Sequence, residues 1–170
     1  MRVYFDSAST ARINPEVLKT YESLLEKYYV NSESLYDEGS EIFRMMEKAR
    51  RAIAGLLGVT SQDIIFTSGS SESNSSAIKG VCLAVPEKKH IVTSCVEHSS
   101  VLNCCHQMEK LFGYEVTYLP VDHNGRVSVE DVKKAVREDT ALVSIMWVNN
   151  ESGAINPIEE IAEYVKKHTH

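Results

Sequence analysis

Apolar positions repeat with helical spacing in the first third of the chain, and strand-like runs alternate with helical segments afterwards. Asn14-Pro15 pairs a capping residue with proline at the first helical position, and apolar residues then mark one helical face as far as Tyr28. A polar loop is predicted from Val30 to Gly39. The second amphipathic helix that follows ends at Gly58, because glycine readily adopts the left-handed conformation that closes a helix.

From Ile64 onward, four short apolar runs have the length and composition of β-strands. They are Ile64 to Thr67, His90 to Cys95, Val116 to Val121, and Leu142 to Val148. The last is nearly all apolar, as expected of a strand buried on both faces. A helical segment follows each run, and strands that alternate with helices form a largely parallel sheet through right-handed crossovers. The pattern therefore predicts an α/β fold.

The helix between the last two predicted strands carries a start signal of its own. Ser128 is followed three residues later by Asp131, a capping-box pattern in which two side chains bond to backbone N–H groups. We expect this helix to continue as far as Val136.

Composition narrows the classes of function. The 170 residues are 43% hydrophobic, enough for a substantial core, and the formal net charge is -6 with dispersed basic residues. This charge disfavours a nucleic-acid partner. The sequence contains no run of eighteen apolar residues and no signal peptide, which predicts a cytoplasmic protein with no membrane partner. The four cysteines form neither a C-x-x-C pair nor a secreted framework, as expected in a reducing compartment.

The segment Phe66 to Asn74 carries the strongest chemical signal, because a predicted strand runs into a Gly/Ser turn and then a helix. Backbone N–H groups at a helix N-terminus lack carbonyl partners and lie at the positive end of the helix dipole, so they bind phosphate. Ser70 and Ser71 add hydroxyl donors. The turn lacks the lysine of a P-loop and the three glycines of a dinucleotide fingerprint, which disfavours a nucleotide. The simpler interpretation is that Ser71 only caps the helix.

Two further loops leave the ends of predicted strands with functional residue types. In parallel sheets ligands bind beyond the carboxyl ends of the strands, where these loops and the Gly/Ser turn would converge. Cys95 to Ser100 offers His98, a flat ring able to stack or to form hydrogen bonds, and Asn149 to Gly153 offers the amide of Asn150. Taken singly, His98 fits a surface or structural histidine, and Asn149-Asn150 fits an ordinary turn.

A metal site is the alternative role for the cysteines and histidines. Cys95 and His98 have C-x-x-H spacing, and Cys104, Cys105 and His106 lie close by in the sequence. A structural zinc needs four convergent ligands, however, and Cys105 falls on the apolar face of its helix, where a free cysteine is a small core residue. We therefore predict no metal site, and inert thiols at Cys104 and Cys105 because neither has a cationic neighbour to activate it.

Four motifs, in order, give the chain a resemblance to a known family. Tyr4 to Thr10 resembles its YLDNAAT opening, Phe66 to Asn74 its FTSGGTEAN loop, Glu97-His98 its EH pair, and Val143 to Gly153 its VSIM-x-x-NNE-x-G run. The chain resembles the N-terminal part of a cysteine desulfurase, a class V aminotransferase-like enzyme that uses pyridoxal 5′-phosphate and has the fold type I architecture. The resemblance covers essentially the whole chain.

This resemblance implies a three-layer α/β/α fold with a mainly parallel sheet, forming part of the large domain of fold type I transferases. Residues 1–60 would be an N-terminal helical segment that contributes to the small domain and to dimer contacts, and residues 61–170 part of the α/β cofactor-binding domain. By the same resemblance, Ser70 and Ser71 bind the cofactor phosphate. His98, the catalytic residue, would stack on the pyridine ring, and Asn150 would form a hydrogen bond with the phenolic oxygen of that ring.

The resemblance further implies removal of sulfur from L-cysteine to give alanine and an enzyme persulfide, in sulfur metabolism and iron-sulfur cluster assembly. Partners would be a second copy in a homodimer or a complementary C-terminal half, together with a sulfur acceptor or scaffold protein. The alternative is a non-catalytic, degenerate desulfurase fragment that acts as an interaction domain.

The chain departs from the family pattern at several positions. Ser70-Ser71 replaces Gly-Thr, which restricts the turn and predicts weaker phosphate binding. The family's Asn-Pro-x-Ser-x-His loop appears as Asn31 to Tyr36, without the proline and the histidine. The family's pyridinium-binding aspartate, Schiff-base lysine and nucleophilic cysteine have no counterpart, so we expect the chain alone to be inactive.

Overall fold

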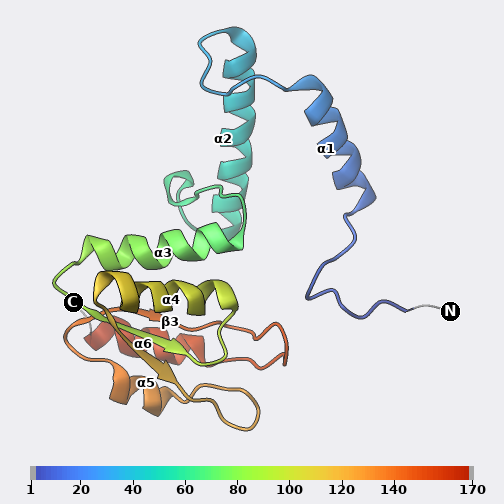
Figure 1. The fold of residues 1–170 in the computed structure, drawn as a ribbon. Helices are drawn as coiled ribbons and strands as arrows, with labels where there is room; N and C mark the ends of the chain where they lie inside the picture. Colours follow the sequence, from blue (N-terminus) through green and yellow to red (C-terminus); the bar gives the residue numbers. More distant parts are fainter. Residues whose placement is uncertain (1–2, 169–170) are drawn as a thin grey trace. The chain divides into compact units, whose positions relative to one another are not determined.

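The computed structural model describes residues 3–168 (Figure 1). The chain divides into two compact units, one extending to Phe66 and the other beginning at Thr67. The roles predicted for residues 1–60 and 61–170, in dimer contacts and in cofactor binding, stay predictions.

The first unit contains the helices α1 (Pro15–Lys27) and α2 (Asp37–Leu57), followed by the short 3-10 helix η1 (Ser61–Asp63). Asn14 caps α1 as predicted, because its side chain accepts a hydrogen bond from the backbone N–H of Glu16 over 2.8 Å. Helix α2 begins inside the segment predicted as a loop, and it ends as predicted at Gly58, whose φ is 68°.

Helix α1 buries none of its residues and contacts α2 through one end. The Tyr28 hydroxyl donates a hydrogen bond to Oε1 of Glu41 over 2.5 Å, and the Lys27 ammonium pairs with the same carboxylate oxygen. Apolar side chains of both helices line a shallow hollow between them, including Leu24, Met45 and Ala49. Much of this apolar surface is exposed.

The second unit has three layers, and its sheet is parallel with strand order β2-β1-β3. The strands are β1 (His90–Ser94), β2 (Glu115–Leu119) and β3 (Thr140–Ser144). Figure 1 shows α3 (Ser70–Ala84) and α4 (Ser99–Phe112) over one face of the sheet, with α5 (Val129–Ala135) and α6 (Ile158–His168) over the other.

The core follows from the alternation of side chains along the central strand β1. Ile91 packs with residues of α3 and α4, whereas the next residue, Val92, packs with Val132 of α5 and Ile161 of α6. Both faces of β1 are therefore covered, and all five of its residues are buried.

His90 joins the three strands at the end of the sheet where they begin. Its Nδ1 lies 2.9 Å from the Thr140 hydroxyl oxygen, and its Nε2 lies 2.8 Å from that of Thr117. The ring is fully buried, and burial lowers the pKa of His90. A neutral imidazole can satisfy two hydroxyl groups in this way, because one ring nitrogen donates and the other accepts.

Two predicted strands differ from those observed. Ile64 to Thr67 was predicted as a strand, but none of the described residues pairs with it, and Ile65 is 80% exposed. The carbonyl oxygen of Ile64 instead accepts a hydrogen bond from the Arg50 side chain, so this end of the segment is bonded outside any sheet. The strand predicted at Leu142 to Val148 begins at Thr140 and ends at Ser144, because β1 offers no ladder partner beyond the pair Thr93–Ser144.

Two finer predictions about burial and capping are also wrong. Strand β3 is half-buried over most of its length rather than buried on both faces, because it lies at an edge of the described sheet. Ser128 does occupy the N-cap position of α5, but its side chain forms no capping hydrogen bond. The Asp131 carboxylate instead pairs with Lys134 on the same helix.

Candidate functional site

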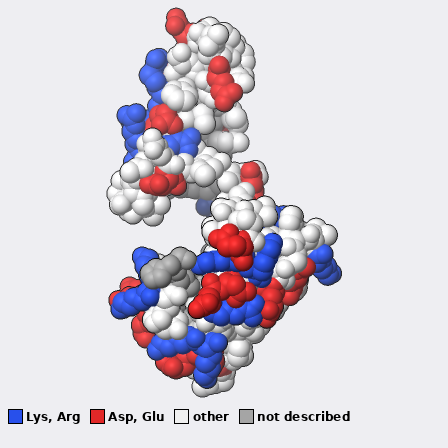
Figure 2. Space-filling view, turned by 90° about the vertical axis from the view of Figure 1, so that its left-hand side faces the viewer, with Lys and Arg blue, Asp and Glu red and all other residues white. Residues whose placement is uncertain are grey.

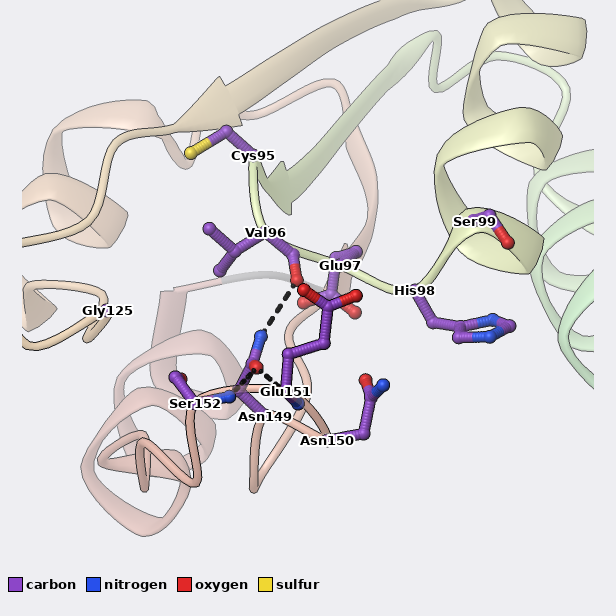
Figure 3. A pocket seen from close by; sticks show the side chains of 10 residues that line it. All are labelled: Cys95, Val96, Glu97, His98, Ser99, Gly125, Asn149, Asn150, Glu151 and Ser152. Atoms are coloured by element: carbon purple, nitrogen blue, oxygen red, sulfur yellow. Dashed lines mark hydrogen bonds between the residues drawn. The ribbon is translucent and has the colours of Figure 1, made fainter. Parts of the chain in front are cut away.

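A cavity of about 530 Å³ opens where β1 and β3 end. The chain leaves β1 toward α4 on one face of the sheet and leaves β3 toward α6 on the opposite face (Figure 1). Two neighbouring strands whose connections part in this way create a crevice, and α/β proteins bind ligands there. The lining comprises, together with Gly125, residues of the two loops: Cys95, Val96, Glu97, His98, Ser99, Asn149, Asn150, Glu151 and Ser152 (Figure 3).

Asn149 holds the second loop in place. Its Nδ2 donates to the carbonyl oxygen of Val96 over 3.1 Å, and its Oδ1 accepts from the N–H groups of Glu151 and Ser152, each over 2.9 Å (Figure 3). Asn149 is buried by these contacts, whereas the side chain of Asn150 is exposed at the cavity. The two asparagines therefore differ: the first organises the loop, and the second exposes its side chain at the cavity.

Glu97 connects the two strands next to the cavity. It is only 7% exposed, and its Oε1 accepts hydrogen bonds from the Ser94 hydroxyl over 2.9 Å and from the Met146 N–H over 2.7 Å. Burial raises the pKa of this carboxyl group, and the two hydrogen bonds oppose that shift. Ser94 ends β1 and Met146 follows β3, so Glu97 keeps the two diverging segments together.

His98 occupies the N-cap position of α4. Its Nδ1 accepts a hydrogen bond from the backbone N–H of Ser100 over 3.2 Å and lies 2.8 Å from the Ser100 hydroxyl oxygen. That hydroxyl also accepts from Nδ2 of Asn74, one turn into α3, over 2.8 Å. The ring itself is exposed at the cavity, and Figure 3 shows the amide of Asn150 extending from the other loop toward the side where His98 lies.

Ser70 and Ser71 lie in the first turn of α3, and neither lines the cavity. Both are exposed, and within residues 3–168 neither hydroxyl has a hydrogen-bond partner. The N-cap of this helix is Gly69, so the simpler interpretation of Ser71 as the cap is wrong. The structure thus places His98 and Asn150 at one cavity, and the side chains of Asn74 and Ser100 connect α3 to His98.

The turn before α3 is closed by Glu72. Its carboxylate accepts hydrogen bonds from the backbone N–H and the hydroxyl of Ser68, each over 2.7 Å, and these contacts lower the pKa of Glu72. The negative charge is therefore held within the turn by these two hydrogen bonds. It faces Ser68 rather than the two serines that follow Gly69.

The cysteines are distributed between the core and the cavity. Cys82, Cys104 and Cys105 are buried between α3 and α4, and burial raises the pKa of Cys82 to about 11 and that of Cys105 to about 12. Cys95 is exposed and lines the cavity. In the described part of the chain, no three histidine, cysteine or acidic side chains gather closely enough to hold a metal ion.

Three residues with clear contacts at the site have no role in the sequence analysis: Asn74, Glu97 and Ser100. Asn74 and Glu97 do lie inside the motifs quoted for the family resemblance, and their place in those motifs could have indicated a role at the site. Ser100 is two residues beyond the Glu97-His98 pair, and its contact with Asn74 spans 26 residues. No local sequence pattern predicts a contact between residues so far apart in the chain.

The fold and the site define an α/β protein of the kind that binds its ligand at the carboxyl ends of parallel strands. The chain belongs to the Aminotransferase class-V family, whose sequence profile matches residues 3–170. Its structure is similar to that of a NifS-like protein, with TM-score 0.93, 40% identity, and coverage of 98% of this chain and 46% of the other. The predicted resemblance and fold class are thereby confirmed.

The curated relatives carry names that agree with this family. The chain is 48% identical to cysteine desulfurase IscS of Dictyoglomus turgidum, covering 98% of this chain and 42% of the relative. It is 41% identical to a cysteine desulfurase of Trichormus azollae, covering 97% and 41% respectively. A solved structure described as SspA in complex with cysteine is similar with TM-score 0.91 and 36% identity, covering 96% of this chain and 47% of that one. The chain thus spans about two fifths of the length of the curated relatives it matches.

On the face drawn in Figure 2, basic and acidic side chains are interspersed. Arg137 pairs with Glu115 and with Asp139, each over 2.6 Å. Among residues 3–168, no helix is both long enough and apolar enough to cross a membrane.

Proposed function

We propose that the chain is part of a cysteine desulfurase that uses pyridoxal 5′-phosphate, and that it supplies the residues that bind the phosphate and the ring. The observation that carries the proposal is that His98 and Asn150, from loops far apart in sequence, line one cavity at the ends of β1 and β3. The family of the chain is dependent on pyridoxal 5′-phosphate, and the relatives named above are cysteine desulfurases.

The start of α3 fits a phosphate group. The N–H groups of the first helical turn have no carbonyl partners and lie at the positive end of the helix dipole. The hydroxyls of Ser70 and Ser71 are exposed and add two donors. Glu72 keeps its negative charge, but its hydrogen bonds hold the carboxylate at Ser68 rather than at the two serines that follow Gly69. Ser70 and Ser71 therefore hold the phosphate in this proposal.

The cavity fits a planar ring next to that phosphate. His98 presents an exposed imidazole that stacks on the pyridine ring, and the Asn150 amide donates a hydrogen bond to the phenolic oxygen. When bound, pyridoxal 5′-phosphate supplies an electron sink for bond breaking at the substrate. The residues of this chain bind and orient the group, and Asn149 keeps Asn150 in place.

The complete enzyme would transfer the sulfur of L-cysteine to a cysteine thiol, giving alanine and an enzyme persulfide. The isolated chain is proposed to lack this activity. No lysine is among the described residues that line the cavity, and three of the four thiols are buried in the core. A second copy or a complementary polypeptide would complete the enzyme, and a sulfur acceptor or scaffold protein would take the sulfur onward.

A non-catalytic interaction domain is the second candidate. The observation that favours it is the exposed apolar surface at the end of α2 in the first unit, where Leu56 is 87% exposed and Leu57 is 65% exposed. Exposed apolar patches of this kind mark contacts with other proteins. An interaction domain would not need to bind the cofactor, and this difference separates the two candidates.

Titration with pyridoxal 5′-phosphate tests the proposal through Trp147, the one tryptophan of the chain. Trp147 is 68% exposed and lies two residues before Asn149, so a cofactor bound in the cavity quenches its fluorescence. His98→Ala should weaken binding, whereas His123→Ala, in an exposed turn, should not. Saturable quenching that both variants retain equally would remove the assignment of His98. The absence of saturable quenching in every form would favour the interaction domain.

A further inference from the structure

The ring of His98 is held by a chain of hydrogen bonds that begins on another helix. Nδ2 of Asn74 donates to the Ser100 hydroxyl over 2.8 Å, and that hydroxyl lies 2.8 Å from Nδ1 of His98. The backbone N–H of Ser100 also donates to the same nitrogen over 3.2 Å. Helices α3 and α4 thereby meet at the histidine that faces the cavity.

The direction of these bonds determines where the proton of the imidazole lies. A backbone N–H can only donate, so Nδ1 of His98 must be an acceptor. Because the Ser100 hydroxyl accepts from Asn74, its own hydrogen is available for Nδ1. In the neutral ring the proton therefore lies on Nε2, which has no partner among the described residues.

We propose that Asn74 and Ser100 are positioning residues that fix both the tautomer and the orientation of His98. They act through His98 and need not touch a ligand. Its consequence for cofactor binding rests on the proposed function. A ring that is already held in one orientation loses no rotational freedom when it stacks on the cofactor, so binding costs less free energy. Asn74 also places this arrangement one turn after Ser70 and Ser71, so the phosphate-binding turn and the stacking ring are coupled through one side chain.

The tautomer can be read without any cofactor by ¹⁵N NMR of the full chain labelled at histidine. The His98 signals are assigned as those that disappear in His98→Ala. We expect the unsubstituted chain to show a protonated Nε2 and an unprotonated Nδ1. The backbone N–H of residue 100 still donates to Nδ1 in Ser100→Ala and in Asn74→Ala, so each should raise the population of the second tautomer only in part. Ser100→Thr, which keeps the hydroxyl, should retain the first tautomer.

Matched controls come from the same two helices. Ser76→Ala in α3 and Asn103→Ala in α4 change exposed residues of the same types and should leave the His98 signals unchanged. In a titration followed by Trp147 fluorescence, Ser100→Ala and Asn74→Ala should weaken binding of pyridoxal 5′-phosphate by about twofold to tenfold, the range expected for one lost hydrogen bond. Circular dichroism verifies that each variant is folded.

The outcomes separate this inference from the proposed function. A proton on Nδ1 in the unsubstituted chain overturns the inference even if a variant fails to fold. So does a tautomer population that is unchanged in both Ser100→Ala and Asn74→Ala, because the backbone N–H of residue 100 would then fix the tautomer without the two side chains. If the tautomer responds as expected but no form binds pyridoxal 5′-phosphate, the positioning of His98 stands and the proposed function fails.

Discussion

Glu97 Oε1 accepts a hydrogen bond from the backbone N–H of Met146 over 2.7 Å, and this bond links the loop after β1 to the segment after β3. The two segments diverge toward opposite faces of the sheet, so without such links the cavity between them would have no fixed width. Asn149 supplies a second link through the carbonyl oxygen of Val96. The candidate site is therefore held by hydrogen bonds of Glu97 and Asn149, which join its two loops, as well as by the side chains that are exposed at the cavity.

Removal of the Glu97 carboxylate should destabilise the second unit. Glu97→Ala leaves the N–H of Met146 and the hydroxyl of Ser94 without their acceptor, and a buried unpaired polar group costs about 1–3 kcal/mol. Glu97→Gln keeps an oxygen that accepts both bonds and should cost less. Urea unfolding measures the difference, with Glu138→Ala at an exposed position as the control. Equal losses in Glu97→Ala and Glu97→Gln would contradict the role of the acceptor oxygen.

His90 should make the stability of the second unit depend on pH. Because burial lowers the pKa of His90 in the folded chain, the unfolded chain binds a proton more readily. The neutral ring contributes its full stability at pH values above 6.5, the ordinary pKa of histidine. This contribution is lost as the pH falls below 6.5 toward the lowered pKa of the folded chain. The free energy of unfolding, measured from pH 8 to pH 5, should fall less in His90→Gln than in the unsubstituted chain. The same fall in both would show that His90 does not carry the effect.

The isolated chain should release no sulfide from L-cysteine, even with added pyridoxal 5′-phosphate. Within residues 3–168, no lysine lines the cavity to bind the cofactor covalently. Sulfide formation measured with the purified, metal-free chain would refute this expectation. If a complementary polypeptide restores turnover, His98→Ala should reduce it more than His123→Ala.

The chain should associate with a partner rather than persist as a free monomer. In the described sheet, β2 and β3 each have one edge without a paired strand, and unpaired edges promote association. Half-buried residues of β3, such as Leu142 and Val143, each forgo part of the roughly 2 kcal/mol that full burial of an aliphatic side chain provides. Either a second copy or a complementary polypeptide would cover them.

Light scattering and amide exchange on the purified chain test this association. A complex should form at micromolar concentration, and Ile64 to Thr67 should exchange quickly unless a partner strand pairs with it. A stable monomer with strong protection across that segment would disprove the prediction.

Much of the α/β framework could be predicted from the sequence because its signals are local. Asn14-Pro15 begins α1 and Gly58 ends α2, since a cap and a left-handed glycine need only their own turn of chain. The alternation of apolar runs with amphipathic segments likewise indicates a parallel sheet covered by helices. Such patterns indicate which face of an element is buried. In the helices and strands that pack against one another, the buried face is the one that the pattern predicts.

The tertiary structure decided what depends on partners far along the chain. Ile64 to Thr67 has the composition of a strand, but a strand also needs a neighbour, and none of the described residues provides one. Asn149 and Asn150 look alike in the sequence, yet only Asn149 reaches Val96, 53 residues away. The hydrogen bonds that orient His98 and position Met146 join residues that meet only after the helices pack on the sheet. Their directions follow from three-dimensional geometry, which no local pattern of residues contains.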